Sequence, residues 1–521
     1  MHIGIDLGTT FCCMAYIDEN GLPKVIPNAE GTLTTPSVIY FDGKSAYVGN
    51  KANQRKITFN SPIFEFVKRD MSSPIEIPPN FYADGKTLKE LKPYEIGGFK
   101  YGPEGMSALI LRYLKKCAIL HFKRNKLLND SIDEKNFILD AIITVPAYFG
   151  DKERQATKLA GFAAGLNVVG IINEPTAASL TYGHNLQKKE KLLVFDLGGG
   201  TFDVTILEIK NGEAFVISSE GANALGGKDW DKVIISYIYS EFNKRTNKDI
   251  PTDLSWDIQQ KALEAKFNLT EVKEYEVTIS VEGEDVVIKL CRRAPQTNEY
   301  EIETDRPFYF DERCSDLIAQ LRTLCLRAIE KSNLDWDDLD DIILAGGACR
   351  MPMIPEMLEK LTFKKVKKDR EGFSYDTAIA IGAALYGHQK SKVHDVAAST
   401  VGIKLKQEQG GREFIEHLLM KGTRLPYKVE QKYFAGANAL LEVYEGESES
   451  VDECIRRGKV SLDNIDGYVD VSLEETIEGE LKITAKYPNG SKELKLQHEL
   501  YNYEERAMPL RDKIMSININ L

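Results

Sequence analysis

The sequence predicts an α/β protein built from two related halves and followed by an antiparallel β-domain. The first observation is a repeat: Gly4-Ile-Asp-Leu-Gly-Thr-Thr returns as Phe195-Asp-Leu-Gly-Gly-Gly-Thr, so Asp6 and Asp196 hold equivalent positions. The second is an alternation of strand-length apolar runs with segments of helical periodicity. The third is a change of pattern near residue 398, beyond which apolar and polar residues alternate as they do in half-buried strands.

Length and composition limit the classes of protein that remain. The chain has 521 residues, 43% of them hydrophobic and 28% charged, which predicts several globular units. Its net charge of −12 opposes sequence-independent binding to nucleic acid or anionic membranes, so neither is an expected partner. The sequence starts without a secretory signal pattern, and its eight cysteines form no C-x-x-C pair. We therefore expect a reduced, cytoplasmic protein without structural zinc or disulfides.

Each copy of the repeat predicts a β-hairpin with a glycine-rich tip. After Asp6 an outgoing strand covers residues 13–17, before the turn at Asn20-Gly21. In the second copy the outgoing strand covers residues 204–209, before Asn211-Gly212. Glycine tips let backbone N–H groups approach phosphate oxygens, threonine hydroxyls add donors, and a carboxylate can hold Mg²⁺ directly or through water. The chain has neither a P-loop nor a G-x-G-x-x-G motif, so we expect two facing tips to bind one magnesium triphosphate.

Helices and further strands fill the region up to residue 388. A helix is expected at 106–126, a buried strand at 141–145, and a helix that begins at Asp151 as N-cap and ends near residue 166. This rhythm is typical of α/β layers, and we assign residues 1–388 to one domain with two lobes.

The C-terminal third divides into three expected parts. Residues 389–397 are a linker, residues 398–505 form a small antiparallel β-domain, and residues 506–521 are a short tail. The β-pattern is clearest at six alternating apolar positions: Val469, Val471, Leu473, Leu481, Ile483 and Ala485.

Seven motifs, in one order along the chain, resemble those of the heat shock protein 70 (DnaK-type) chaperone family. They are Ile5-Asp-Leu-Gly-Thr-Thr, Val145-Pro-Ala-Tyr-Phe, Ile172-Asn-Glu-Pro-Thr-Ala-Ala, Phe195-Asp-Leu-Gly-Gly-Gly-Thr-Phe-Asp-Val, Leu225-Gly-Gly-Lys-Asp-Trp-Asp, Ala345-Gly-Gly-Ala-Cys-Arg-Met-Pro and Ile379-Ala-Ile-Gly-Ala-Ala. The β-region is similar to the family's peptide-binding domain through Leu440-Leu-Glu-Val-Tyr-Glu-Gly-Glu and Gly479-Glu-Leu-Lys-Ile-Thr-Ala. The resemblance implies an actin-like, ribonuclease-H-like ATPase domain followed by a β-sandwich peptide-binding domain, in a short form without the C-terminal helical lid.

The same resemblance implies ATP or ADP and Mg²⁺ as cofactors and assigns roles to individual residues. The catalytic set is Asp6, Lys68, Glu174, Asp196 and Thr201, in which Asp6 and Asp196 organise Mg²⁺ through water and Lys68 positions the attacking water. The nucleotide-binding set is Gly8, Thr9, Thr10, Gly198, Gly199, Gly200, Thr201, Glu264, Lys266, Thr270, Gly346, Gly347, Arg350 and Asp376. Pro146 and Arg154 fall at the family's interdomain relay.

Four of these residues also have plain structural interpretations. Lys68 fits a solvated surface lysine, and Glu174 fits a turn residue before a proline. Pro146 fits the end of a strand, and Arg154 fits a surface charge on a helix.

The chain departs from the family pattern at several positions. Leu263 stands where a base-contacting glutamate belongs, and Ala348 replaces a hydroxyl residue. Phe267 offers a ring that stacks on adenine or lies in the core, and we expect the core. Gly170 replaces an arginine that meets a J-domain partner, so such a co-chaperone is doubtful, whereas a nucleotide-exchange factor remains an implied partner class.

Two further departures concern the peptide-binding part. The linker segment Lys392-Val-His-Asp-Val-Ala-Ala lacks the family's leucines, so less apolar area is available for docking and we expect weak coupling. Without a lid, a bound segment of unfolded or extended polypeptide is expected to leave quickly.

The leading hypothesis is an ATP-dependent molecular chaperone, with slow hydrolysis of ATP to ADP and phosphate that changes peptide affinity. One alternative is a nucleotide-gated regulator or scaffold with little turnover. Another is an actin-like filament protein or a sugar kinase, although neither needs the C-terminal β-domain.

Overall fold

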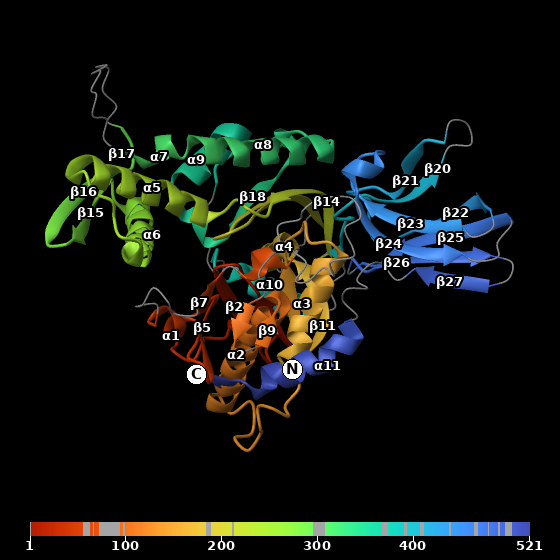
Figure 1. Ribbon diagram of the computed structural model, residues 1–521, viewed down its shortest axis with the longest axis horizontal. Helices are drawn as coiled ribbons and strands as arrows, with labels where there is room; N and C mark the ends of the chain where they lie inside the picture. The colour runs from red at the N-terminus through yellow and green to blue at the C-terminus, as the bar shows by residue number, and fades with distance from the viewer. Residues whose placement is uncertain are drawn as a thin grey trace.

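The computed structural model contains two α/β lobes and a β-domain at one side of them (Figure 1). The described residues are 2–55, 63–65, 67–71, 94–96, 99–183, 189–210, 213–294, 308–366, 374–389, 393–406, 411–436, 439–462, 467–477, 479–487, 490–494 and 503–521.

The first lobe, lobe I, is built on a sheet in the order β11-β10-β1-β2-β3, with β4 also pairing with β2. β1 pairs antiparallel with β2 and parallel with β10, so the first repeat forms the predicted hairpin. The bounds are β1 His2–Asp6, β2 Phe11–Ile17, β3 Pro23–Val25, β4 Thr34–Pro36, β10 Leu139–Val145 and β11 Leu166–Asn173.

The second lobe, lobe II, repeats this arrangement with the order β18-β12-β13-β14-β19. β12 pairs antiparallel with β13 and parallel with β18, as β1 does with β2 and β10. The shared pattern of one antiparallel and one parallel neighbour supports duplication of the hairpin unit, although the turn at 211–212 lies outside the described residues. The bounds are β12 Glu190–Leu197, β13 Phe202–Lys210, β14 Glu213–Ala222, β18 Asp341–Ala345 and β19 Val393–His394.

Two helices, α4 (Glu174–Gly183) and α10 (Ala378–Gln389), lie between the sheets near the centre of the molecule (Figure 1). One apolar cluster contains side chains of both lobes, among them Ile142 of β10 and Val194 of β12. On lobe I, α2 (Pro103–Arg124) and α3 (Asp151–Ala163) pack against each other. The sheets of the two lobes are therefore joined through a shared apolar cluster.

Smaller elements extend each lobe. On lobe I they are β5 Val38–Phe41, β6 Ser45–Val48, α1 Asn50–Asn53, β7 Ile63–Glu65, the 3-10 helix η1 Val67–Asp70, β8 Tyr94–Ile96 and β9 Phe99–Tyr101. On lobe II they are α5 Gly227–Thr246, η3 Thr252–Leu254, α6 Ser255–Glu271, β15 Glu274–Val281, β16 Glu284–Cys291, β17 Phe308–Tyr309, α7 Phe310–Arg313, α8 Ser315–Ser332, η4 Trp336–Asp338, η5 Gly347–Arg350 and α9 Met353–Thr362.

The β-domain consists of two four-stranded antiparallel sheets that share one apolar core. Their orders are β21-β20-β23-β24 and β22-β25-β26-β27. Val469, Val471 and Leu473 of β25 and Ile483 and Ala485 of β26 are buried, which confirms the alternation in the sequence. The bounds are β20 Val401–Lys406, β21 Glu413–Leu419, β22 Tyr427–Ala435, β23 Ala439–Glu445, η6 Val451–Glu453, β24 Ile455–Leu462, β25 Gly467–Glu475, β26 Leu481–Tyr487 and β27 Gly490–Leu494.

Both ends of the β-domain connect to the lobes. The linker forms β19, which pairs in parallel with β14 of lobe II. The expected tail instead forms α11 (Tyr503–Ser516) and β28 (Asn518–Asn520), and β28 pairs with β6 of lobe I. The helix thus begins before the expected boundary at residue 506, and the C-terminal segment packs on the first lobe.

The helix expected from Asp151 exists, but Gly150 is its N-cap and Asp151 is its first helical residue. All eight cysteines are free, and no helix among the described residues has the length and apolar character needed to span a membrane.

Candidate functional site

The tips of the two hairpins contact each other. A Cβ atom added at Gly199 would lie 1.8 Å from Oγ1 of Thr10, and one at Gly200 would lie 2.6 Å from Cγ2 of Thr9. Side chains at these positions would push the tips apart, so the glycines are required by close approach. The two copies of the repeat therefore converge on one place, as the sequence predicted.

Four carboxylates gather beside these tips, from Asp6, Glu174, Asp196 and Asp203. Asp6 ends β1, Asp196 lies in β12 and Asp203 in β13, while Glu174 begins α4. The Oγ1 of Thr144 in β10 donates to Oδ1 of Asp6 over 3.4 Å. Two strands from one lobe and two from the other thus place acidic and hydroxyl groups around a common centre.

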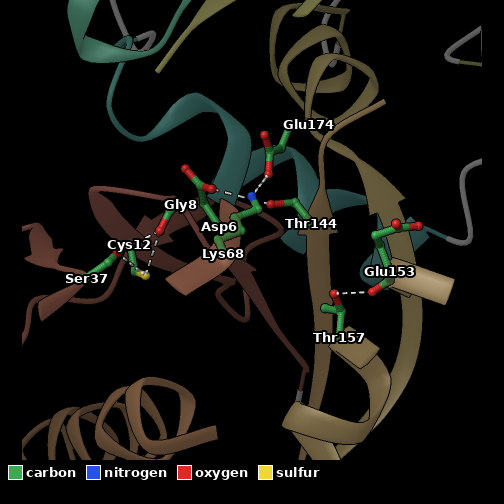
Figure 2. A network of polar contacts seen from close by, with 9 residues as sticks. All are labelled: Asp6, Gly8, Cys12, Ser37, Lys68, Thr144, Glu153, Thr157 and Glu174. Atoms are coloured by element: carbon green, nitrogen blue, oxygen red, sulfur yellow. Dashed lines mark hydrogen bonds and ion pairs between the residues drawn. The ribbon is translucent and has the colours of Figure 1, made fainter. Parts of the chain in front are cut away.

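Lys68 supplies positive charge at this centre. It follows Val67 in η1, is only 5% exposed, and forms an ion pair with Glu174. Figure 2 shows its nitrogen between the carboxylates of Asp6 and Glu174. Burial alone would lower the pKa of Lys68, but the attraction of Glu174 and Asp6 outweighs it and raises this pKa. Lys68 is therefore a buried cation, and the interpretation as a surface lysine is wrong.

The crowded carboxylates have raised pKa values. Burial and the repulsion of Glu174 raise the pKa of Asp6 to about 7, partly offset by the attraction of Lys68. Burial and Glu174 also raise the pKa values of Asp196 and Asp203 well above the ordinary range. One lysine thus compensates only part of the negative charge, so the centre favours a further cation.

Several buried polar atoms at or beside the tips have no hydrogen-bond partner among the residues that the structure describes. They are Oγ1 of Thr9, Oγ1 of Thr10, Nε of Arg69 and Oδ1 of Asp203. Hydroxyl and guanidinium donors match phosphate oxygens, and a free carboxylate oxygen matches a metal-bound water. No three His, Cys, Asp or Glu side chains in the described part of the chain are placed to hold a metal directly. The hydroxyl, guanidinium and carboxylate groups present therefore fit a nucleotide phosphate together with Mg²⁺.

Hydrogen bonds from neighbouring segments fix the backbone of each hairpin tip. In the first, Oγ of Ser37 donates to the carbonyl oxygen of Gly8 over 2.7 Å (Figure 2). In the second, the amides of Gly227 and Lys228 donate to the carbonyl oxygens of Gly198 and Gly199, both over 2.9 Å. These two amides lie at the start of α5, so the N-terminal end of a helix dipole is close to the second tip and favours an anion there.

Helix α6 contributes Lys266 to the same neighbourhood. Its Nζ donates to the carbonyl oxygen of Gly227 over 2.9 Å and pairs with Asp231 at 2.7 Å. Thr270, one turn later, donates to the backbone of its own helix at Lys266. Glu264 is exposed and accepts a hydrogen bond from the hydroxyl of Tyr275 in β15. The structure thus joins Lys266 to the second tip and places Glu264 toward the β15 hairpin.

Phe267 corrects a prediction. Its side chain is 55% exposed, so it does not lie in the core. The reason is helical periodicity: Ala265, Lys266 and Leu269 take the buried face of α6 and leave Phe267 outside. The Nζ of Lys266 lies 5.8 Å from the centre of its ring.

Residues 346–350, which follow β18, lie next to the carboxylate centre. Gly346 has a φ of 78°, and a Cβ there would lie 2.7 Å from Oδ1 of Asp196. Arg350 pairs with Asp376 at 2.6 Å, and its guanidinium lies 5.1 Å from the centre of the Tyr375 ring. A Cβ on Gly347 would lie 3.1 Å from Oδ1 of Asp376. This group is half exposed, and Gly346 connects it to the carboxylate centre.

Arg154, one of the two residues assigned to the relay, connects lobe I to the linker through Asn173. Arg154 is only 6% exposed and donates to the backbone of Phe149 and to Oδ1 of Asn173. The Nδ2 of Asn173 in turn donates to Oδ2 of the linker residue Asp395. Arg154 is therefore a buried connector and not a surface charge. Pro146 is buried directly after β10 and accepts the amide of Phe149.

Sequence reasoning gave no role to Arg69, Asp203, Asp231, Asn173 and Asp395. Arg69 donates to the carbonyl oxygen of Gly200 and pairs with Asp229 at 3.5 Å, so it connects η1 to the second tip. Asp203 follows Phe202 inside the repeated motif, and its position next to the glycine tip is the signal that could have identified it. The partners of the other three are remote in sequence, and local pattern carries no signal for them.

The family model described as Hsp70 protein matches residues 2–506. This match covers nearly the whole chain, including both hairpins, the carboxylate centre, the linker and the β-domain. Members of the family are ATPases that bind ATP and act as chaperones on polypeptides. The chain therefore belongs to the Hsp70 family.

Proposed function

We propose that this protein is an ATP-dependent chaperone that hydrolyses ATP slowly and thereby changes the affinity of its β-domain for extended polypeptide. The observation that carries the proposal is the convergence of two Asp-Gly-Thr hairpins on a group of buried carboxylates beside one buried lysine. In-line attack on a γ-phosphate needs charge neutralisation and an oriented water, which this arrangement can supply.

The proposed roles follow from position. Thr9 and Thr10 bind phosphate oxygens through their buried hydroxyls, which have no partner among the described residues. Thr201 and the glycine tip at 198–200, which contacts Thr9 and Thr10, bind phosphate from the other hairpin. Asp6 and Asp196 hold Mg²⁺ through water, and bound Mg²⁺ supplies neutralisation of phosphate charge. Lys68 and Glu174, already paired, orient the water that attacks. A cation bound beside Asp6, Asp196 and Asp203 would lower their raised pKa values, because positive charge favours the ionised carboxylates.

Coupling to the β-domain is proposed to run through the linker. β19 continues the sheet that carries the second hairpin, since β19 pairs with β14 and β14 with β13. The chain of hydrogen bonds from Arg154 through Asn173 to Asp395 connects lobe I to the same linker. A change in the separation of the lobes would therefore reach the β-domain through two routes.

Single-turnover hydrolysis of ATP tests the enzymatic part. Lys68→Ala removes the buried cation, and we expect the rate to fall about 100-fold, the usual effect of losing one positioned electrostatic group. Lys24→Ala, at an exposed lysine of β3, is the matched control and should keep the parent rate. A parent rate equal to that of Lys68→Ala would contradict hydrolysis and favour the nucleotide-gated scaffold, which Leu263, Gly170 and the altered linker motivate.

Peptide affinity measured with ATP and with ADP tests the coupling. A coupling free energy of about 1–3 kcal/mol corresponds to a change of roughly five- to 150-fold in the dissociation constant of a labelled extended peptide. Equal affinities in the two nucleotides would remove the coupling and leave the ATPase intact. No measurable peptide binding in either nucleotide would remove the chaperone proposal.

A further inference from the structure

The C-terminal residues 503–521, which we call the strap, return from the β-domain to lobe I. The strap consists of α11 and β28, and Figure 1 shows α11 beside α3, with the C-terminus below the first lobe and away from the β-domain. The family match ends at residue 506, so most of the strap lies beyond it.

β28 completes a sheet of lobe I. It pairs in parallel with β6, with Asn518 opposite Ser45 and Ile519 opposite Ala46, in the order β28-β6-β5-β7. Ile519 is 2% exposed and belongs to the main apolar cluster of lobe I, together with Ile514 and Ile517. The strap thus pairs through its backbone and buries apolar side chains in the same core.

Cations of lobe I bind the backbone of the strap. Nη1 of Arg112, a 3% exposed side chain of α2, donates to the carbonyl oxygens of Ile514 and Ile517, both over 2.6 Å. Nζ of Lys116 donates to the carbonyl oxygen of Ile519 over 2.9 Å. Carbonyls at the end of a helix lack partners within it, and a buried arginine satisfies them here. Each of these bonds joins residues about 400 positions apart.

The helix of the strap also fits closely. Cδ1 of Leu510 would lie 3.4 Å from a Cβ added at Gly105 of α2, and the sulfur of Met515 would lie 3.8 Å from one added at Gly165 after α3. The guanidinium of Arg511 lies 5.1 Å from the centre of the Phe162 ring of α3. The docking surface on lobe I is therefore shaped for this segment.

The β-domain is consequently attached at both of its ends. Its N-terminal end continues from β19, which is paired with lobe II, and its C-terminal end continues into the strap, which is docked on lobe I. Nine peptide units separate Leu494 from Tyr503, a reach of at most about 32 Å at ~3.6 Å per residue. While the strap is docked, the end of β27 cannot move farther than this from the start of α11.

We propose that the strap is an intramolecular tether that limits how far the β-domain can move from lobe I, so that full separation of the β-domain requires release of β28 from β6. This inference does not depend on ATP hydrolysis or on peptide binding. It predicts two populations of the protein. In one the strap is docked and the distance of the β-domain from lobe I is limited, and in the other the strap is released.

Ile519→Asp is the first test, with Asn518→Asp as its control. Asp at 519 places a carboxylate in the core of lobe I, whereas Asp at 518 places it at an exposed position of the same strand. Two readouts are combined: hydrogen exchange of the β6 amides, and the distance between spin labels on Lys24 of lobe I and Lys428 of the β-domain. We expect Ile519→Asp to speed β6 exchange at least tenfold and to add a longer-distance population. Asn518→Asp should match the parent.

A second variant keeps lobe I intact. A protease site is inserted between Leu494 and Tyr503 and cut after folding, with complete cleavage checked on a gel. The strap stays bound to β6, so β6 exchange should remain slow while the longer-distance population appears. If the label distances stay at the parent values after cleavage, and also after release of the strap in Ile519→Asp, the tether is refuted. Fast β6 exchange in the parent would refute docking of the strap itself.

Discussion

Lys68 and Arg154 show how burial changes the role of a charged residue. Judged from the sequence alone, each residue fits a solvated surface cation. In the structure, however, Lys68 is only 5% exposed and Arg154 only 6% exposed. Each buried charge then has specific partners, Glu174 for Lys68 and Asn173 for Arg154. Only the family resemblance indicated these roles, because nothing in the local sequence shows which lysine or arginine is buried.

Glu475 of β25 is a second buried charge with a measurable consequence. It is 9% exposed, and burial raises its pKa to about 7, with the attraction of Arg154 opposing and the repulsion of Asp151 adding to the shift. An acid whose pKa is raised in the folded state binds more protons when folded than when unfolded. Stability therefore falls as the pH rises from about 4.5 to about 7.

The prediction is that Glu475→Gln removes this pH-dependent loss. At pH 8 the variant should unfold at a higher temperature than the parent, by an amount that corresponds to at most about 3 kcal/mol, and at pH 4.5 the two should differ little. Glu474→Gln, at an exposed neighbour paired with Lys428, is the control and should show no such pH dependence. Thermal unfolding followed at both pH values measures the effect. A parent that is equally stabilised at pH 4.5 and pH 8 would be inconsistent with the raised pKa.

At the scale of elements, the sequence predicted those helices and strands whose formation depends on residues close together in the chain. The hairpins, α3, β10 and the strands of the β-domain follow from alternation, periodicity and turn residues. The strap was not predicted, because Ile519 has its partner at Ala46 and no local pattern encodes that contact. Phe267 was assigned to the wrong face of α6 because the direction of the core was unknown before folding.

The docking of the linker was also not predictable from local sequence. Its lack of leucines led us to expect poor docking, yet β19 docks through backbone pairing with β14. His394 also stacks on Phe215, with ring centres 4.3 Å apart, and buried Asp395 accepts from Asn173. Main-chain pairing and buried polar contacts thus dock the linker, although docking was expected to depend on apolar side chains.

Asp395→Ala tests this docking. Removing the carboxylate takes away the acceptor of the buried Nδ2 of Asn173, and a buried donor left without its acceptor typically costs about 1–3 kcal/mol. We expect the β19 amides to exchange at least tenfold faster and the linker to be cleaved sooner by protease. Asp470→Ala, at an exposed residue paired with Lys432, should leave both unchanged. Unaltered exchange in Asp395→Ala would show that backbone pairing alone holds the linker.

At the scale of the whole molecule, the nucleotide site and the domain attachments share the same elements. The second hairpin belongs to the sheet that binds the linker, and the first belongs to the lobe that binds the strap. The two lobes meet at the tips, through Gly199 and Thr10. A ligand that draws the tips together would therefore act on both attachments of the β-domain.

Calorimetric titration of Mg·ATP into the parent, Thr10→Val and Thr201→Val tests the shared site most directly. Each variant deletes one hydroxyl from one hairpin, and Thr323→Val, at an exposed residue of α8, is the control. The account predicts one ATP per chain and a loss of about tenfold in affinity, or ~1.4 kcal/mol, for either hairpin variant. Parent affinity in either hairpin variant would contradict a single nucleotide held by both.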